Sequence, residues 1–125
     1  MTRRAHHRLH PLVLIAGGGF LGALLRYGVA EALPTAFPWG TLAANVGGTF
    51  LLGILLYEAH LADMLSAETR LLVGTGFCSS FTTYSTFAAE TTQLSPQLAA
   101  VNVAANYALG FLAVVLGQLV ARWLS

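Results

Sequence analysis

Four apolar stretches, each long enough to cross a bilayer, make up most of this 125-residue chain. A helix crosses the hydrocarbon core with about 20 apolar residues, and the stretches cover residues 12–32, 39–57, 71–92 and 98–121. Charged residues are only 9% of the chain, against roughly 25% in soluble domains. The sequence therefore predicts an all-α membrane protein with one domain, residues 1–125. In it, four transmembrane helices follow a basic N-terminal tail at residues 1–11, and both termini lie on one side.

The third stretch differs from the others because it is rich in hydroxyl groups. The segment Thr75–Thr86 carries a hydroxyl on 8 of its 12 side chains and no formal charge. Serine and threonine compete with helical hydrogen bonds by bonding to nearby backbone, which favours a break near residues 79–83. A continuous helix whose hydroxyls bond back to their own turn is the alternative. Polar groups at bilayer depth are tolerated where they find protein partners or line a water-filled path. This segment therefore predicts a permeation route.

Amide side chains form a second polar line. Asn102, Asn106 and Gly110 recur every four residues and so share one helix face. Asn45 is the only amide in the second stretch. Such residues either hold helices together or extend the hydroxyl-rich segment into a continuous path of hydrogen-bond donors. Small residues four apart predict close packing of helix backbones; the pairs are Gly18 and Gly22, Ala44 and Gly48, and Thr49 and Gly53.

Two charged side chains lie within or beside the predicted spans. Arg26 either extends to the far membrane interface or attracts anions at a vestibule, and Glu90 is either interfacial or at a pore mouth. The near balance of charges leaves no basic surface for nucleic acid, and the lone Cys78 excludes an intrachain disulfide. The sequence has no HExxH motif and no convincing nucleophile–base pair, so no enzymatic activity is expected.

Four runs of this sequence resemble the Fluc (CrcB) family of fluoride ion channels. They are GGGFLGALLRY at 17–27, PWGTLAANVGGTFLLG at 38–53, GTGFCSSFTTYSTFAAE at 74–90 and NVAANYALG at 102–110. The resemblance covers all four predicted spans. It implies a dual-topology, antiparallel homodimer in lipid, with two fluoride pores that are each lined by both subunits. It also implies passive export of fluoride across the bacterial cytoplasmic (inner) membrane, which relieves fluoride toxicity.

The same resemblance assigns roles to single residues. The family's pore positions fall on Tyr84 and Phe87 (its two phenylalanines), Asn45, Asn106, Arg26 at the vestibule, and Glu90. A structural sodium ion at the dimer interface is also implied, held by the backbone carbonyls of Ser79 and Thr82 at the break in the third helix.

The chemistry of these side chains suits fluoride, a small and strongly hydrated anion that needs close donors in place of water. Such donors are the hydroxyls and amides of Thr82, Thr83, Ser85, Asn45 and Asn106. The edge of an aromatic ring is electropositive and can contact an anion weakly. Several weak sites favour conduction, because an ion must enter readily and also leave.

The sequence departs from the family pattern in three places. Ser79-Ser80 stands where the family usually has Gly-Gly, Tyr84 replaces the first phenylalanine, and Gly110 stands where a serine is expected. Serine allows fewer backbone conformations at the break than glycine does. Tyr84 adds a hydroxyl where a ring edge is expected to meet the anion, and Gly110 leaves the polar line of the fourth span with one hydrogen-bond donor fewer.

Two other arrangements compete with a homodimeric channel. A small proton-coupled multidrug transporter has a similar length, but it needs a carboxylate in the first span, where this chain has residues 18–23, GGFLGA. An obligate heterodimer with an oppositely oriented relative is favoured by the arginines. Those predicted on the side of the termini are Arg3, Arg4, Arg8, Arg70 and Arg122. Only Arg26 lies toward the other side, and positive residues favour the cytoplasm.

Overall fold

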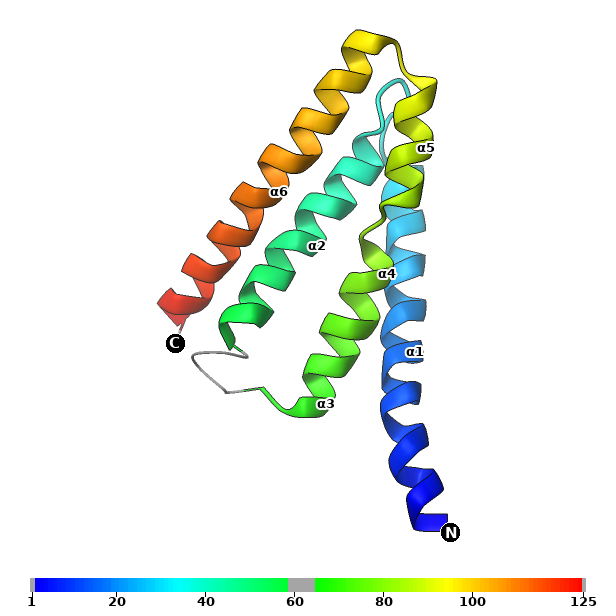
Figure 1. Cartoon of the computed structure of the whole chain (residues 1–125), viewed down its shortest axis with the longest axis vertical. Helices are drawn as coiled ribbons and strands as arrows, with labels where there is room; N and C mark the ends of the chain where they lie inside the picture. Colours follow the sequence, from blue (N-terminus) through cyan, green and yellow to red (C-terminus); the bar gives the residue numbers. More distant parts are fainter. Residues whose placement is uncertain (1, 59–64, 125) are drawn as a thin grey trace.

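The computed structural model describes residues 2–58 and 65–124, and the side chains of residues 8–58 and 65–124. Its elements are α1 (Thr2–Ala32), α2 (Trp39–Tyr57), α3 (Ala67–Arg70), the π-helix η2 (Leu71–Cys78), α4 (Ser79–Phe81), α5 (Ser85–Gln93) and α6 (Pro96–Leu124). All regular structure among these described residues is helical, which confirms the predicted all-α class. Both chain ends lie at the end of the bundle opposite to the α1–α2 and α5–α6 turns (Figure 1).

Among the described residues, three helical segments are long and apolar enough to cross a membrane: Arg8–Ala32 within α1, together with α2 and α6. The bounds of α2 are those predicted, whereas α1 begins at Thr2 and so continues through the residues predicted as a tail. The side chains of Arg3 and Arg4 lie outside the described residues. The third predicted span consists of η2, α4 and α5 in succession.

The start of α6 has a local cause in the sequence. The Ser95 hydroxyl oxygen accepts a hydrogen bond from Leu98 N–H (3.4 Å), and the Ser95 carbonyl accepts one from Ala99 N–H (2.8 Å). Pro96 follows as the first helical residue, where its missing N–H and fixed φ are suitable. The chain can therefore turn directly from α5 into α6.

Glycines let two pairs of helices approach closely. Between α1 and η2, a Cβ atom added at Gly18 would meet the Leu72 carbonyl oxygen, and one at Gly22 would lie 2.5 Å from the Phe77 carbonyl oxygen. Between α2 and α6, a Cβ atom at Gly53 would meet the Val114 carbonyl oxygen. The close packing predicted from the spacing of these small residues is confirmed.

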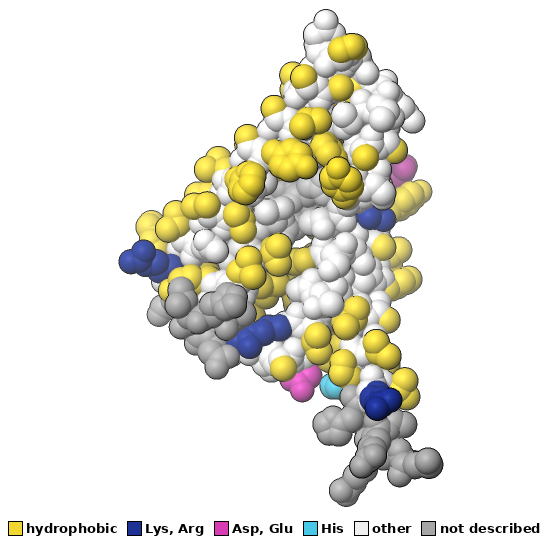
Figure 2. All heavy atoms as spheres, viewed as in Figure 1, with side chains coloured by type: hydrophobic (Ala, Val, Ile, Leu, Met, Phe, Trp, Pro, Cys, Tyr) yellow, Lys and Arg dark blue, Asp and Glu magenta, His cyan; other side chains and the backbone are white. Residues whose placement is uncertain are grey.

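Large apolar side chains cover the outside of the bundle. Phe20, Tyr27, Phe111 and Trp123 are all more than half exposed. On the face shown in Figure 2, hydrophobic side chains extend along most of the bundle, and only a few charged ones lie among them. An exposed apolar surface of this extent is typical of a protein that contacts lipid.

We expect Gly117→Ala to destabilise the fold and Gly110→Ala, on the same helix, to be tolerated. A Cβ atom at Gly117 would meet the Phe50 carbonyl oxygen and lie 3.1 Å from the Ile54 nitrogen, whereas one at Gly110 would meet nothing within 4 Å. Such crowding costs about 1–3 kcal/mol, while an unhindered Gly-to-Ala change in a helix stabilises by roughly 0.5–1 kcal/mol. Thermal unfolding in detergent measures both variants, and equal midpoints would contradict the α2–α6 packing described here.

Candidate functional site

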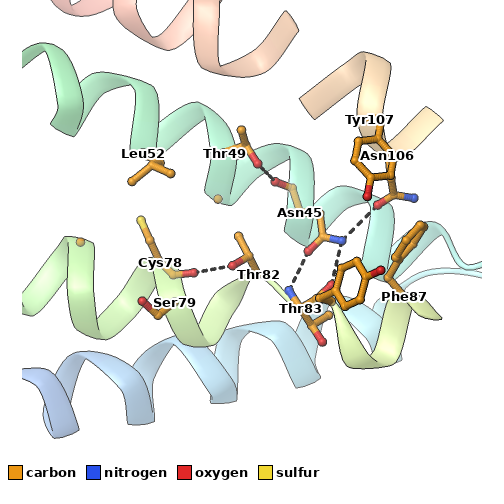
Figure 3. A pocket seen from close by; sticks show the side chains of 13 residues that line it. Asn45, Thr49, Leu52, Cys78, Ser79, Thr82, Thr83, Phe87, Asn106 and Tyr107 are labelled. Atoms are coloured by element: carbon orange, nitrogen blue, oxygen red, sulfur yellow. Dashed lines mark hydrogen bonds between the residues drawn. The ribbon is translucent and has the colours of Figure 1, made fainter. Parts of the chain in front are cut away.

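The backbone leaves helical geometry between α4 and α5. Thr82 is extended (φ −78°, ψ 155°), and α5 begins only at Ser85. The side chain of Asn45, on α2, pairs with both backbone polar groups of Thr83. Asn45 Oδ1 accepts a hydrogen bond from Thr83 N–H (2.7 Å), and Asn45 Nδ2 donates one to the Thr83 carbonyl oxygen (3.1 Å). One amide thus replaces the helical partners of this residue (Figure 3).

Two carbonyl groups at this interruption lack their helical donors. In a continuous α-helix, Thr83 N–H would bond to the Ser79 carbonyl and Thr86 N–H to the Thr82 carbonyl. Here Thr83 N–H donates to Asn45 instead, and Thr86 N–H donates to Thr83 Oγ1 (3.2 Å). The Ser79 and Thr82 carbonyl oxygens can therefore accept other partners.

A groove of about 390 Å³ opens beside this interruption, between α2 and α6 on one side and η2, α4 and α5 on the other. Its polar lining comes from the hydroxyl-bearing residues Thr49, Ser79, Thr82, Thr83, Tyr84 and Tyr107 and from the amides of Asn45 and Asn106. No charged side chain lines it among the described residues. Figure 2 shows the molecule hollowed in the middle of this face, and Figure 3 shows the groove from close by.

Three aromatic rings stand together at one end of the groove. Phe87 is only 7% exposed and lies between the other two, while Tyr84 is 72% exposed. The ring centroids of Tyr84 and Phe87 are 5.9 Å apart, with a 55° interplanar angle. Phe87 and Tyr107 are 6.4 Å apart and nearly perpendicular, at 77°. Ring pairs with such tilted or edge-to-face geometry attract one another, so Phe87 is held from two sides.

A second cavity, of about 250 Å³, lies near the turn between α1 and α2. It brings Arg26 of α1 together with Glu90 and Thr86 of α5 and Thr41 of α2. Thr41 Oγ1 donates a hydrogen bond to the Glu90 carboxylate, at 2.5 Å. The cavity therefore combines one cationic and one anionic side chain with hydroxyl groups.

The structure divides the predicted site residues between these two cavities. Those that line the groove are Asn45, Ser79, Thr82, Thr83, Tyr84, Phe87 and Asn106, and those that line the second cavity are Arg26 and Glu90. Ser85 is exposed and lines neither. Both amide hydrogens of Asn45 are donated within the protein, because its Nδ2 also donates to Asn106 Oδ1 (3.0 Å). In this arrangement Asn45 holds helices together.

Two lining residues, Tyr107 and Thr41, were not predicted from the sequence. Thr41, Asn45 and Thr49 recur every four residues, so this spacing places all three on one face of α2 and could have identified Thr41. Tyr107 directly follows Asn106, and its contact with Phe87 depends on how α6 is rotated against α5. No local sequence pattern reports that rotation.

The described part of the chain thus combines helices long and apolar enough to span a membrane with a hydroxyl-lined groove, free of charged side chains, beside an interrupted helix. The chain belongs to the CrcB-like protein family: residues 13–118 match the family described as "CrcB-like protein, Camphor Resistance (CrcB)".

Individual relatives agree with this assignment over most of the chain. The chain is 58% identical to "Fluoride-specific ion channel FluC 1" of Natronomonas pharaonis, over 91% of this chain and 96% of that protein. It is 54% identical to "Fluoride-specific ion channel FluC 2" of Halobacterium salinarum, over 86% of this chain and 84% of the relative. A third relative, "Fluoride-specific ion channel FluC 1" of Haloarcula marismortui, is 50% identical over 90% of this chain and 91% of its own length.

Proposed function

We propose that this protein is a fluoride-specific ion channel, and not an enzyme, that exports fluoride passively across the cytoplasmic membrane and so relieves fluoride toxicity. The observation that carries the proposal is the groove, whose lining combines hydroxyls and aromatic rings with no charged side chain among the described residues. The relatives named as fluoride-specific channels support it.

Within the groove, the Thr83 hydroxyl and the ring edges are free to contact an anion. The hydroxyls of Thr49 and Thr82 already donate to backbone carbonyl oxygens of their own helical segments (2.5 Å and 2.9 Å). Thr83 Oγ1 accepts the hydrogen bond from Thr86 N–H, which leaves its own hydroxyl hydrogen to donate. Tyr84 presents a hydroxyl and a ring edge that is electropositive. By contrast, an ion at Asn45 or Asn106 must displace hydrogen bonds within the protein. Several weak contacts of this kind suit an ion that must both enter and leave.

The two charged side chains of the predicted site, Arg26 and Glu90, line the second cavity and not the groove. We propose that Arg26 attracts fluoride there, next to Glu90 and Thr41. A proton-coupled exchanger needs a carboxylate that alternately binds a proton and the substrate. The Glu90 carboxylate already accepts a hydrogen bond from Thr41, and no carboxylate lines the groove in the described chain. Passive flow is therefore the simpler mechanism.

The freed carbonyls support the proposal of a structural sodium ion. Hard cations prefer oxygen ligands, and interrupted helices bind cations through unpaired carbonyls. The Ser79 and Thr82 carbonyl oxygens meet this requirement, since their helical donors are bonded elsewhere. Ser79 has ordinary right-handed helical angles (φ −62°, ψ −34°), which serine adopts without strain. The serine in place of the family's usual glycine is thus compatible with the site.

We further propose that the channel is an antiparallel dimer whose third span is broken at mid-membrane. The groove is open on one side, with Tyr84 at its exposed edge, so a second subunit is needed to enclose an ion path. A homodimer is the simplest arrangement. The bias of arginines toward the terminal side, with only Arg26 opposite, favours a heterodimer with an oppositely oriented relative as the second candidate.

Liposomes that contain this chain alone are expected to release fluoride rapidly down its gradient and chloride far more slowly, as followed with ion-selective electrodes. Release only after reconstitution with an oppositely oriented relative would establish the heterodimer. Transport of a cationic dye driven by a pH gradient, with no fluoride release from either preparation, would contradict the channel.

Phe87→Ile is expected to reduce fluoride flux to the background leak, because it removes the buried ring between Tyr84 and Tyr107. Tyr84→Phe is expected to be tolerated, because it keeps the ring and removes only an exposed hydroxyl. The flux assay is run on protein that elutes as folded dimer. Normal conduction by Phe87→Ile would show that the aromatic rings do not line the ion path.

Replacing sodium by a bulky organic cation during purification is expected to weaken flux or dimer assembly, because the Ser79 and Thr82 carbonyls would lose the cation that they bind. Restoring sodium should recover both. The measurements are size-exclusion chromatography and fluoride efflux in each buffer. Full activity after exhaustive sodium removal would rule the ion out.

A further inference from the structure

A chain of side-chain hydrogen bonds continues from Asn45 beyond the groove. It runs from Thr83 N–H to Asn45 Oδ1 (2.7 Å), from Asn45 Nδ2 to Asn106 Oδ1 (3.0 Å), from Asn106 Nδ2 to Asn102 Oδ1 (3.0 Å), from Asn102 Nδ2 to Thr91 Oγ1 (2.9 Å), and from Thr91 Oγ1 to the Phe87 carbonyl oxygen (2.6 Å). We call these bonds the asparagine network. Each side chain accepts from the previous member and donates to the next.

The asparagine network begins and ends on the same part of the fold. Its first donor, Thr83, lies just before α5, and its last acceptor, the carbonyl of Phe87, lies in the first turn of α5. In between it passes through α2 and α6. The network therefore fixes the interrupted segment and the start of α5 relative to the two helices across the groove.

Two members of the network lie away from both cavities. Asn102 is only 1% exposed, and neither it nor Thr91 lines the groove or the second cavity. Neither side chain can contact an ion in these spaces without rearrangement. A buried amide whose partners are removed is strongly unfavourable, and linked hydrogen bonds strengthen one another. Asn102 and Thr91 are therefore placed to act through other residues.

We propose that Asn102 and Thr91 are positioning residues that hold Thr83 and Phe87 in the geometry that selects fluoride. This inference rests on the proposed function for its effect on ions. Its structural content, the restraint of the segment from Thr83 to Phe87, is independent of what the channel conducts.

Thr91 offers a matched pair of variants. Thr91→Val keeps the shape of the side chain and removes the hydroxyl, whereas Thr91→Ser keeps the hydroxyl. Asn102→Leu removes the buried amide. For each variant and the unaltered protein, the ratio of fluoride to chloride efflux is measured in liposomes. Amide hydrogen exchange of peptides that cover residues 82–87 is measured in nanodiscs.

Thr91→Val and Asn102→Leu are expected to lower the flux ratio and to speed exchange at residues 82–87 by roughly five- to tenfold, because a buried donor loses its acceptor. Thr91→Ser should resemble the unaltered protein in both measurements. A role in folding alone would reduce the yield of channels and leave the flux ratio unchanged.

An unchanged flux ratio in folded Thr91→Val would overturn the inference, and so would a Thr91→Ser variant as impaired as Thr91→Val. If Asn102→Leu does not fold, the Thr91 pair decides. Failure of the proposed function is distinguishable, because then the unaltered protein itself releases no fluoride. In that case unchanged exchange in Thr91→Val would still refute the restraint, and faster exchange would support it.

Discussion

The pairing of the Asn45 side chain with the backbone of Thr83 is the interaction on which the rest of the site depends. In an apolar environment an unpaired peptide group costs several kcal/mol, so a membrane helix cannot be interrupted unless its polar groups find new partners. A carboxamide carries one acceptor and one donor group, as a peptide does, and Asn45 uses both on the same residue. The stable interruption of the helix and the free carbonyl of Ser79 follow from this substitution of a side chain for backbone.

Close packing of glycines supplies the frame around that interaction. Gly18 and Gly22 bring α1 against η2, and Gly53 and Gly117 bring α2 against α6, each at backbone distance. The two tightly packed pairs leave the groove between them. The π-helix η2 leads directly into α4. Such wide helical turns are rare in proteins as a whole, but where they occur they are often at functional sites. The closely packed helix pairs thus hold the bundle, whereas the irregular run from η2 to α5 shapes the groove.

The three departures from the family pattern are each compatible with this geometry. Ser79 has ordinary helical angles, so the position does not require glycine. Tyr84 is largely exposed and has room for its additional hydroxyl. Gly110 faces open space, since a Cβ atom added there would meet nothing within 4 Å outside its own stretch of helix. The polar contacts of α6 come instead from Asn102 and Asn106, which also tie α6 to α2 and α5.

The sequence by itself determined the class of the fold, the bounds of α2, the close approach of helices at small residues and the segment where polar chemistry gathers. These features depend on local composition and spacing, which a single stretch of chain contains in full. Only the tertiary structure decided that Asn45 meets Thr83, 38 positions away, that Tyr107 joins the ring of Phe87, and that Ser85 lies outside both cavities. Such contacts depend on how each helix is rotated and shifted against its neighbours. That choice is made by the packing of whole helix faces, and no local pattern of residues records it.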